Sequence, residues 1–220
     1  MKKLIFIFCC VCVHEFAHSQ VQLQDPLSGK VLSVSKYANI SGSPFLFDDW
    51  KPGKVKTPKG VYAALNLKYD AYSSTLFFQR NDESYEFADP IESFILSSVK
   101  GDDSRDMYFV NGLEATDLRK NQFVQELCSG KISIYKSVMV FMTEVNKINE
   151  GIVKSFNKSE RFYVKRDGSL EQLRSGKKEF LALFGSAAME IETYAATNEL
   201  SFRKTEDLVK MANYYNNKNK

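Results

Sequence analysis

Residues 60–80, GVYAALNLKYDAYSSTLFFQR, decide the fold class that we expect for this chain. Residues 60–70 include Val61, Tyr62 and Tyr69, residues 75–80 include Phe77 and Phe78, and the short stretch AYSS lies between them. This pattern predicts two antiparallel strands joined by a short connection. We therefore expect an antiparallel sheet around this hairpin.

Strand signals continue on both sides of the central hairpin. Further hairpins are predicted about Asn111-Gly112, Ser129-Gly130 and Asp167-Gly168, because such pairs favour tight turns between strands. The KPGKV stretch at 51–55 is predicted as a turn, and residues 138–160 fit either a strand or a short helix. Together these signals predict an antiparallel β domain over residues 44–174.

The C-terminal segment, residues 175–220, has a different period. Apolar residues recur there at intervals of three and four, which is the period of a helix. Ser175 is the expected N-cap of the first helix, Asn198 its expected end, and Thr205 the expected start of a second helix. The two apolar stripes are Phe180, Phe184, Ala187, Ile191 and Tyr194, and then Leu208, Met211, Ala212 and Tyr215. The predicted fold class is α+β: an antiparallel sheet of short hairpin-connected strands, followed by two C-terminal helices packed on it.

Residues 1–19 are predicted to be a signal peptide. They contain HEFAH at 14–18, which matches the H-E-x-x-H pattern of zinc proteases. However, a basic start and an apolar run from Leu4 to Val13 precede it, and Ala17 and Ser19 stand at the small-residue positions of a cleavage site before Gln20. The apolar run is shorter than the roughly 20 residues that span a bilayer. We therefore expect HEFAH to be removed on export, and residues 20–43 to form a flexible lead-in.

Lipidation is the alternative to simple cleavage, through one of Cys9, Cys10 and Cys12. The residues that precede these cysteines are Phe8, Cys9 and Val11, which are not the small residues that a lipidation site favours. The site at Ala17 and Ser19 is therefore preferred.

Removal of the signal peptide takes away most of the chemistry-bearing side chains. Both histidines and three of the four cysteines lie in it, so the mature chain keeps Cys128 and no histidine. This excludes Ser-His-Asp and Cys-His nucleophiles and the usual zinc sites. Cys128 is expected to be a small buried apolar residue. We predict no catalytic, cofactor-binding or metal-binding residue and no cofactor.

The charge of the mature chain is nearly balanced. The 30 basic and 27 acidic residues of the full chain lose Lys2, Lys3 and Glu15, which leaves a net charge of about +2. A nucleic-acid partner is therefore not expected. No later apolar run reaches membrane-spanning length, so no transmembrane segment is expected in the mature chain.

Acidic residues are the remaining candidates for catalysis. Paired carboxylates would suit glycoside hydrolysis, and the possible sets are Asp48-Asp49, Glu83 with Glu86, Asp102-Asp103-Asp106, and Glu114 with Asp117. Solvated surface is the preferred interpretation of each set. The 102–106 loop lacks the residue spacing of a calcium loop.

Aromatic residues gather near two places in the chain. Phe45, Phe47 and Trp50 are expected to fill the core, and one of Tyr214 and Tyr215 is expected to be exposed.

Four stretches in this order carry a resemblance to a known group of proteins: GSPFLFDDWKPGKV (42–55), FYVKRDGSLEQL (162–173), KKEFLALFG (177–185) and EDLVKMANYYN (206–216). Over about residues 40–217 the chain resembles a family of uncharacterised secreted proteins of Bacteroidetes-type bacteria, a domain of unknown function. The positions that match are Gly42, Ser43, Pro44, Lys177, Lys178, Tyr214, Tyr215 and Asn216. The resemblance implies export and a sheet followed by helices, and it supplies no activity.

Together, these observations predict an exported, non-enzymatic binding or structural protein of the bacterial cell envelope, secreted or periplasmic. Its expected partner is an envelope protein or a glycan. The alternative is a carboxylate-dependent hydrolase that acts on glycans. The two differ in geometry, because such an enzyme needs two carboxylates roughly 5–10 Å apart in a concave site.

Overall fold

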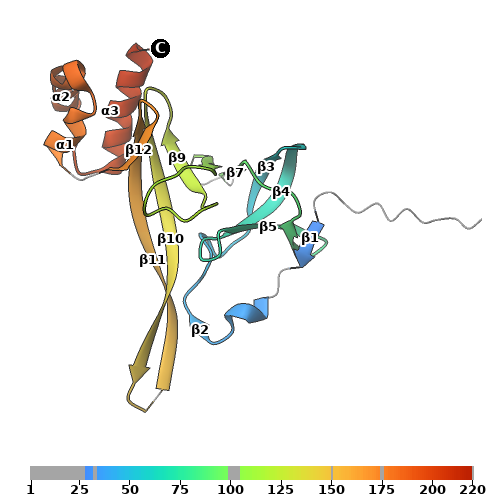
Figure 1. The fold of residues 1–220 in the computed structure, drawn as a ribbon. Helices are drawn as coiled ribbons and strands as arrows, with labels where there is room; N and C mark the ends of the chain where they lie inside the picture. The colour runs from blue at the N-terminus through green and yellow to red at the C-terminus, as the bar shows by residue number, and fades with distance from the viewer. Residues whose placement is uncertain (1–27, 32–33, 99–104, 150, 174–175, 220) are drawn as a thin grey trace, which may run out of the picture.

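The computed structural model describes residues 28–31, 34–98, 105–149, 151–173 and 176–219, and the signal peptide predicted over 1–19 lies outside them. A large, mostly antiparallel sheet is followed by C-terminal helices, so the predicted α+β class is confirmed (Figure 1). The sheet order is β1-β6-β5-β4-β3-β7-β8-β9-β10-β11-β12, and β2 pairs with β11.

The strands are β1 (Ser28–Val31), β2 (Ile40–Ser41), β3 (Lys51–Thr57), β4 (Gly60–Asp70), β5 (Thr75–Arg80), β6 (Glu83–Phe87), β7 (Ser93–Leu96), β8 (Met107–Val110), β9 (Val124–Cys128), β10 (Ile132–Lys147), β11 (Gly151–Arg166) and β12 (Ser169–Gln172). The helices are α1 (Lys177–Ala182), α2 (Ala188–Thr197) and α3 (Thr205–Lys218), with short 3-10 turns η1 (Val34–Tyr37) and η2 (Gly185–Ala187).

The central hairpin forms as predicted, with β4 and β5 antiparallel and Asp70 opposite Thr75. Asp70 is fully buried at the end of β4. Its Oδ1 accepts the backbone N–H groups of Tyr72 and Ser73 at 3.0 and 2.8 Å. The hydroxyl of Tyr37 donates to its Oδ2. These bonds explain why a carboxylate is tolerated in the core, because a buried charge needs hydrogen-bond partners.

Two large apolar cores hold the described residues together, and a smaller third cluster surrounds Tyr135 and Tyr163. The first lies mainly among the strands of the N-terminal half, where it includes Phe78 and Phe94, and it extends to Val140 of β10 and Phe156 of β11. The second lies between the three helices and the part of the β10–β11 pair that is far from its connecting turn. It includes Ile134 and Phe180. Cys128 is buried in the second core, as predicted.

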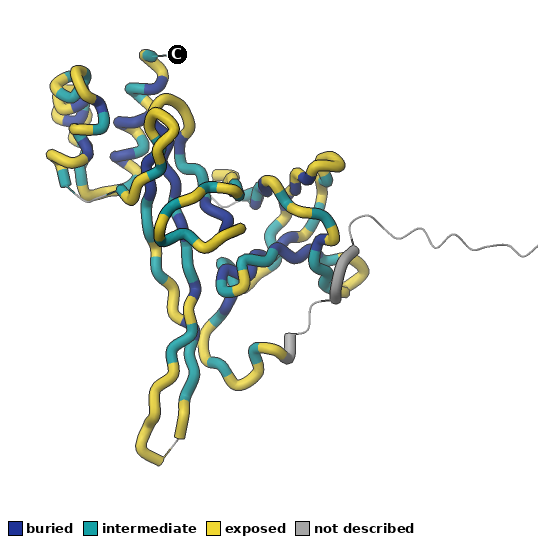
Figure 2. Tube along the Cα trace, in the orientation of Figure 1, coloured by how far each residue is buried: buried dark blue, intermediate teal, exposed yellow. Residues whose placement is uncertain are grey.

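The β10–β11 hairpin resolves the ambiguous segment 138–160 as strand. The two strands are 16 residues each and pair in one continuous register, from Ile132 opposite Arg166 to Lys147 opposite Gly151. Its root is covered by the helices, and its distal part extends well beyond them (Figure 1). We call the distal part, residues 137–161, the arm. Figure 2 shows that exposure increases toward its end.

Two short strands lie within the segment that was predicted as a lead-in. β1 pairs antiparallel with β6. β2 pairs in parallel with β11, and Ile40 lies opposite Lys154. The segment that carries η1 and β2 therefore connects the N-terminal half of the sheet to the arm.

The turn predicted at residues 51–55 is wrong. These residues belong to β3, which pairs with β4 on one side and β7 on the other. Gly53 fits this crowded position because a Cβ atom there would lie 2.2 Å from the carbonyl oxygen of Ile95. The glycine therefore permits a close backbone approach, and not a turn.

The hairpin predicted at Asn111-Gly112 is also wrong. β8 ends at Val110, and its partner β9 begins only at Val124, directly opposite Val110. The intervening loop packs apolar side chains against the buried rings of Tyr135 and Tyr163. This packing competes with a tight turn, and it covers the sheet face that lies opposite the helices.

The first C-terminal helix is broken, so the structure has three α-helices where two were predicted. α1 ends at Ala182, and Gly185 adopts a φ of +55° before η2 and α2. Ser175 lies outside the described residues. Asn198 ends α2 and Thr205 begins α3, both as predicted. None of the helices in the described ranges is long and apolar enough to cross a membrane.

Candidate functional site

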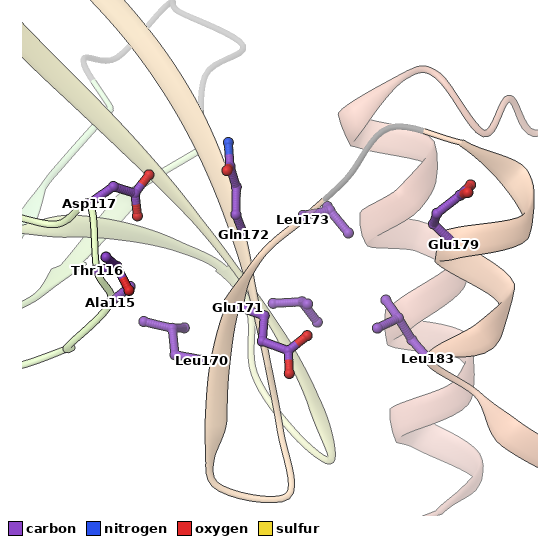
Figure 3. Close-up of a pocket in the computed structure, with 10 residues that line it drawn as sticks. Ala115, Thr116, Asp117, Leu170, Glu171, Gln172, Leu173, Glu179 and Leu183 are labelled. Atoms are coloured by element: carbon purple, nitrogen blue, oxygen red, sulfur yellow. The ribbon is translucent and has the colours of Figure 1, made fainter.

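A groove runs along β12, the last strand in the order of the sheet (Figure 3). One wall is the loop segment 115–117, the other is α1, and β12 lies between them. The groove has a volume of about 700 Å³ and is lined by Ala115, Thr116, Asp117, Val164, Leu170, Glu171, Gln172, Leu173, Glu179 and Leu183. We call it the β12 groove.

The turn before β12 fixes this strand against β11. Asp167 and Gly168 have φ values of +51° and +83°, as expected of a two-residue hairpin turn that follows the twist of the strands. The hairpin predicted about these two residues is therefore confirmed. It places Arg166 opposite Ser169 and Tyr163 opposite Gln172.

β12 presents an open edge to the groove. The backbone N–H of Leu173 donates to the carbonyl of Phe162 at 2.8 Å, so Leu173 faces β11. Backbone direction alternates along an antiparallel strand, so Leu170 and Gln172 direct their N–H and C=O groups away from β11. Among the described residues, no strand pairs with that side of β12. The groove therefore contains unpaired backbone groups that an added strand could use.

The loop wall carries an ion pair. The guanidinium of Arg161 donates to Asp117 Oδ2 at 2.6 Å. Burial raises the pKa of Asp117, but the nearby Tyr163 hydroxyl and Arg161 outweigh this effect and hold the pKa below its ordinary value. Asp117 is therefore ionised at neutral pH and unsuited to act as a general acid, which needs a raised pKa.

Tyr163 lies buried beside this pair. No group in the described part of the chain meets hydrogen-bond geometry with its hydroxyl. The hydroxyl is nevertheless close enough to Asp117 to shift the pKa: burial and then Asp117 raise the pKa of Tyr163 to about 12. The neutral hydroxyl is thus a buried donor next to the groove, and it is not a base.

Two further carboxylates lie on the α1 side of the groove, Glu171 on β12 and Glu179 on α1. Glu171 is exposed and lies on the helix-facing side of β12, because it pairs with Val164 of the second core. Glu179 is also exposed, and its carboxylate lies against Gly176 at the start of α1. Leu173 and Leu183 lie between them (Figure 3). This wall is acidic at its rim and apolar at its floor.

The other carboxylate sets predicted from the sequence do not form paired sites. Glu83 and Glu86 are three positions apart on β6, so they face opposite sides of the strand. Asp106 accepts the backbone N–H of Ser98 at 3.0 Å, while Asp102 and Asp103 lie outside the described residues. Asp48, Asp49 and Glu114 are exposed. Within the described ranges, no group of three or more acidic, histidine or cysteine side chains is placed to hold a metal ion.

The two aromatic groups differ from expectation. Phe45, Phe47 and Trp50 are half-buried; Phe47 packs against the first core, and none of the three is among its buried residues. The ammonium of Lys68 lies 4.5 Å from the ring centre of Phe45 and 5.7 Å from that of Trp50. The Lys68 ammonium thus makes cation–π contacts with both rings, so one face of each ring is next to a charged group.

Neither tyrosine of the Tyr214-Tyr215 pair is fully exposed. Tyr214 stacks on Tyr194 at 4.0 Å between ring centres, and Tyr215 packs edge-on against Phe184 at 5.2 Å. Both rings are half-buried, which corrects the expectation that one of them is exposed.

Comparisons of the chain with protein-family models, with curated proteins and with solved structures found no significant match. The resemblance to a family of secreted bacterial proteins therefore stays a prediction, and the function has to be argued from the geometry of the chain. The groove residues, chiefly leucine, glutamine and glutamate, match no catalytic motif. No local sequence signal locates this site, because an open edge depends on the order of all strands in the sheet.

The arrangement suits binding better than covalent chemistry. Burial raises the pKa of Cys128, the cysteine of the described residues, to about 11, so its thiol is protonated at neutral pH and unreactive. Asp117 is engaged with Arg161. What the groove offers is an open strand edge, an apolar floor and an acidic rim.

Proposed function

We propose that this chain is an exported, non-enzymatic binding protein of the bacterial cell envelope, which binds an extended segment of a partner protein in the β12 groove. The observation that carries the proposal is the open edge of β12 between two walls. An extended peptide that adds a strand to such an edge gains main-chain hydrogen bonds, and the flanking walls select its side chains.

The walls define the chemistry of the partner segment. Side chains alternate along an added strand, so every second residue would face α1. Those residues would meet Glu171 and Glu179 at the rim, and they suit lysine or arginine. The other residues would face Ala115 and Thr116, where small or β-branched side chains fit. We therefore infer an extended segment in which basic residues alternate with small or β-branched ones.

The alternative, a carboxylate-dependent glycan hydrolase, has weaker support. It requires one protonated carboxyl group as general acid and a second carboxylate on the other side of the scissile bond. The low pKa of Asp117 and its bond to Arg161 oppose an acid role at that position.

Strand addition is tested with the Gln172→Pro variant. Proline removes the outward N–H of residue 172 and leaves the bonds between β11 and β12 in place. The probe is a fluorescent synthetic decapeptide of alternating lysine and valine. We expect it to bind the parent, and to bind Gln172→Pro at least about tenfold more weakly in fluorescence anisotropy.

Two controls make this test specific. Gln172→Ala keeps the backbone N–H and should bind as the parent does, and a glutamate–valine peptide should bind far more weakly than the lysine–valine peptide. Amide exchange measured by NMR should show protection of Leu170 and Gln172 on binding. Equal affinities of Gln172→Pro and Gln172→Ala, or unprotected amides at these two positions, would contradict the proposal.

Export is tested by the mass of the mature protein. Because Ala17 and Ser19 form the predicted cleavage site, the protein recovered outside the cytoplasm should begin at Gln20 and carry no lipid. Intact-mass spectrometry of the envelope fraction of an expressing bacterium measures this directly. A mature form that retains residues 14–18 would contradict the assignment and reopen the zinc interpretation of HEFAH.

A further inference from the structure

The outer edge of β10 is unpaired along the arm. β9 pairs with β10 only as far as Lys136. Next to it, Gln122 Nε2 donates to the carbonyl of Val138 at 3.5 Å, and Arg119 Nη2 donates to that of Val140 at 3.0 Å. Beyond Val140, no described strand pairs with this side of β10.

The direction of the free backbone groups follows from these two bonds. The carbonyls of Val138 and Val140 point away from β11, and strand direction repeats every second residue. Met142, Glu144 and Asn146 therefore direct their N–H and C=O groups outward along the same edge. A regular, unpaired edge of this kind is a template for pairing with another strand.

One face of the arm is uncharged over four successive cross-strand pairs. These pairs are Met139 with Ser159, Phe141 with Asn157, Thr143 with Ser155, and Val145 with Val153. Phe141 and Val145 are 44% and 55% exposed. Thr143 lies between them, and its hydroxyl is bonded to that of Ser155 at 3.0 Å. An apolar and hydroxyl face beside a free edge suits contact with another sheet.

We propose that the arm pairs with the arm of a second copy of this chain, antiparallel and about a two-fold axis, with Thr143 opposite Thr143. In this register Phe141 faces Val145 of the second copy, which makes two aromatic–β-branched cross-strand pairs. Met142 and Glu144 exchange backbone hydrogen bonds with Glu144 and Met142 of the second copy. The uncharged face then continues across four strands.

The neighbouring registers are disfavoured by groups already in place. A two-fold axis at Glu144 would place the Glu144 carboxylates of the two copies directly opposite each other, which is destabilising. A two-fold axis at Met142 would set Glu144 and Asn146 opposite Val140 and Val138, whose carbonyls already accept from Arg119 and Gln122. The axis at Thr143 meets only one of these two carbonyls, that of Val140, opposite Asn146 at the outer end of the pairing. A two-fold axis at Val145 would place Phe141 opposite Asn149 of the second copy. Asn149 lies beyond the end of β10, so Phe141 would have no strand partner.

The chosen register also accounts for the most exposed large apolar side chain. Ile148, which is 91% exposed, follows the end of β10. Antiparallel pairing brings the tip of each arm to the root of the other arm, so Ile148 moves out of open solvent. A surface that matches itself over Phe141, Thr143 and Val145 favours a second copy over an unrelated partner, because two-fold interfaces use one patch twice.

Single cysteines in the full mature chain test both the pairing and its register. In a non-hydrogen-bonded antiparallel pair the Cα atoms lie about 4.5 Å apart, within the range that a disulfide spans. Thr143→Cys should therefore form a covalent dimer under mild oxidation, seen on a non-reducing gel. Glu144→Cys and Val145→Cys are the matched controls, since each would cross-link itself only in one of the disfavoured registers. Cys128 is buried and does not compete.

We expect the Thr143→Cys dimer to form at least about fivefold more completely than either control dimer. Light scattering should give a dimeric mass for the parent and for Met142→Ala, and a monomeric mass for Met142→Pro, which lacks an outward N–H. Equal cross-linking of all three cysteine variants would indicate random collision. That result, or a monomeric parent at every concentration, would overturn the proposal.

Discussion

Replacing Phe184 by alanine should lower the free energy of unfolding by about 3–5 kcal/mol, through lost burial and the cavity that remains. The Phe184 ring is 3% exposed and lies between two other rings, those of Phe180 and Tyr215, each at 5.2 Å between ring centres. These contacts join α1 to α3 in the second core. Urea denaturation followed by circular dichroism measures the change.

The matched control is Met189→Ala. Met189 also belongs to the helical segment and is a large apolar residue, but it is 80% exposed, so its loss should cost less than about 0.5 kcal/mol. Glu190 is less suitable as a control, because it accepts a hydrogen bond from the Tyr214 hydroxyl at 2.7 Å. If the midpoints of Phe184→Ala and the parent coincided, the stripe would not be core, and the helices would be an exposed interaction surface.

Replacing Asn216 by alanine should cost roughly 2–4 kcal/mol, because it leaves buried backbone groups without partners. Asn216 Oδ1 accepts the N–H of Ile132 at 3.0 Å, and Nδ2 donates to the carbonyl of Ile132 at 2.7 Å. One side chain thus ties α3 to the start of β10. Gly130 leaves room for it, since a Cβ there would lie 2.5 Å from Asn216 Cγ.

Asn213→Ala is the control for this variant. Asn213 lies one turn earlier on the same helix and is exposed, so its replacement should change the stability by less than about 0.5 kcal/mol. Thermal and urea unfolding of both variants beside the parent give the comparison. Similar stabilities of Asn213→Ala and Asn216→Ala would contradict the prediction, because alanine favours the helix equally at both positions and only Asn216 bonds to Ile132.

Local patterns predicted those parts of the fold in which the partners are close in sequence. The β4–β5 and β11–β12 hairpins and α3 were all found, because turn residues and helical period act within a few residues. The pairs Pro52-Gly53 and Asn111-Gly112 were misinterpreted as turns. Their conformation is set by β7 and by the packing of the following loop, which are remote in sequence.

Local sequence patterns could not predict the candidate site. The β12 groove takes Asp117 from a loop, Glu171 from β12 and Glu179 from α1, and no spacing links the three. Glu114 and Asp117 were predicted together, but only Asp117 lines the groove. Its partner Arg161 is 44 positions away and is placed by the register of β11. An open edge is a property of the whole strand order, which hairpin signals do not determine.

The parallel pairing of β2 with β11 constrains the order in which the chain can fold. Ile40 and Lys154 are 114 positions apart in sequence, and the arm must exist before β2 has a strand to join. Contacts between such distant residues form late, because closing a long loop costs entropy before any bond is gained. During synthesis the first half can fold early, yet its attachment to the arm must wait until Ser155 has left the ribosome. A slow final phase, abolished by deleting residues 40–41, is the kinetic consequence.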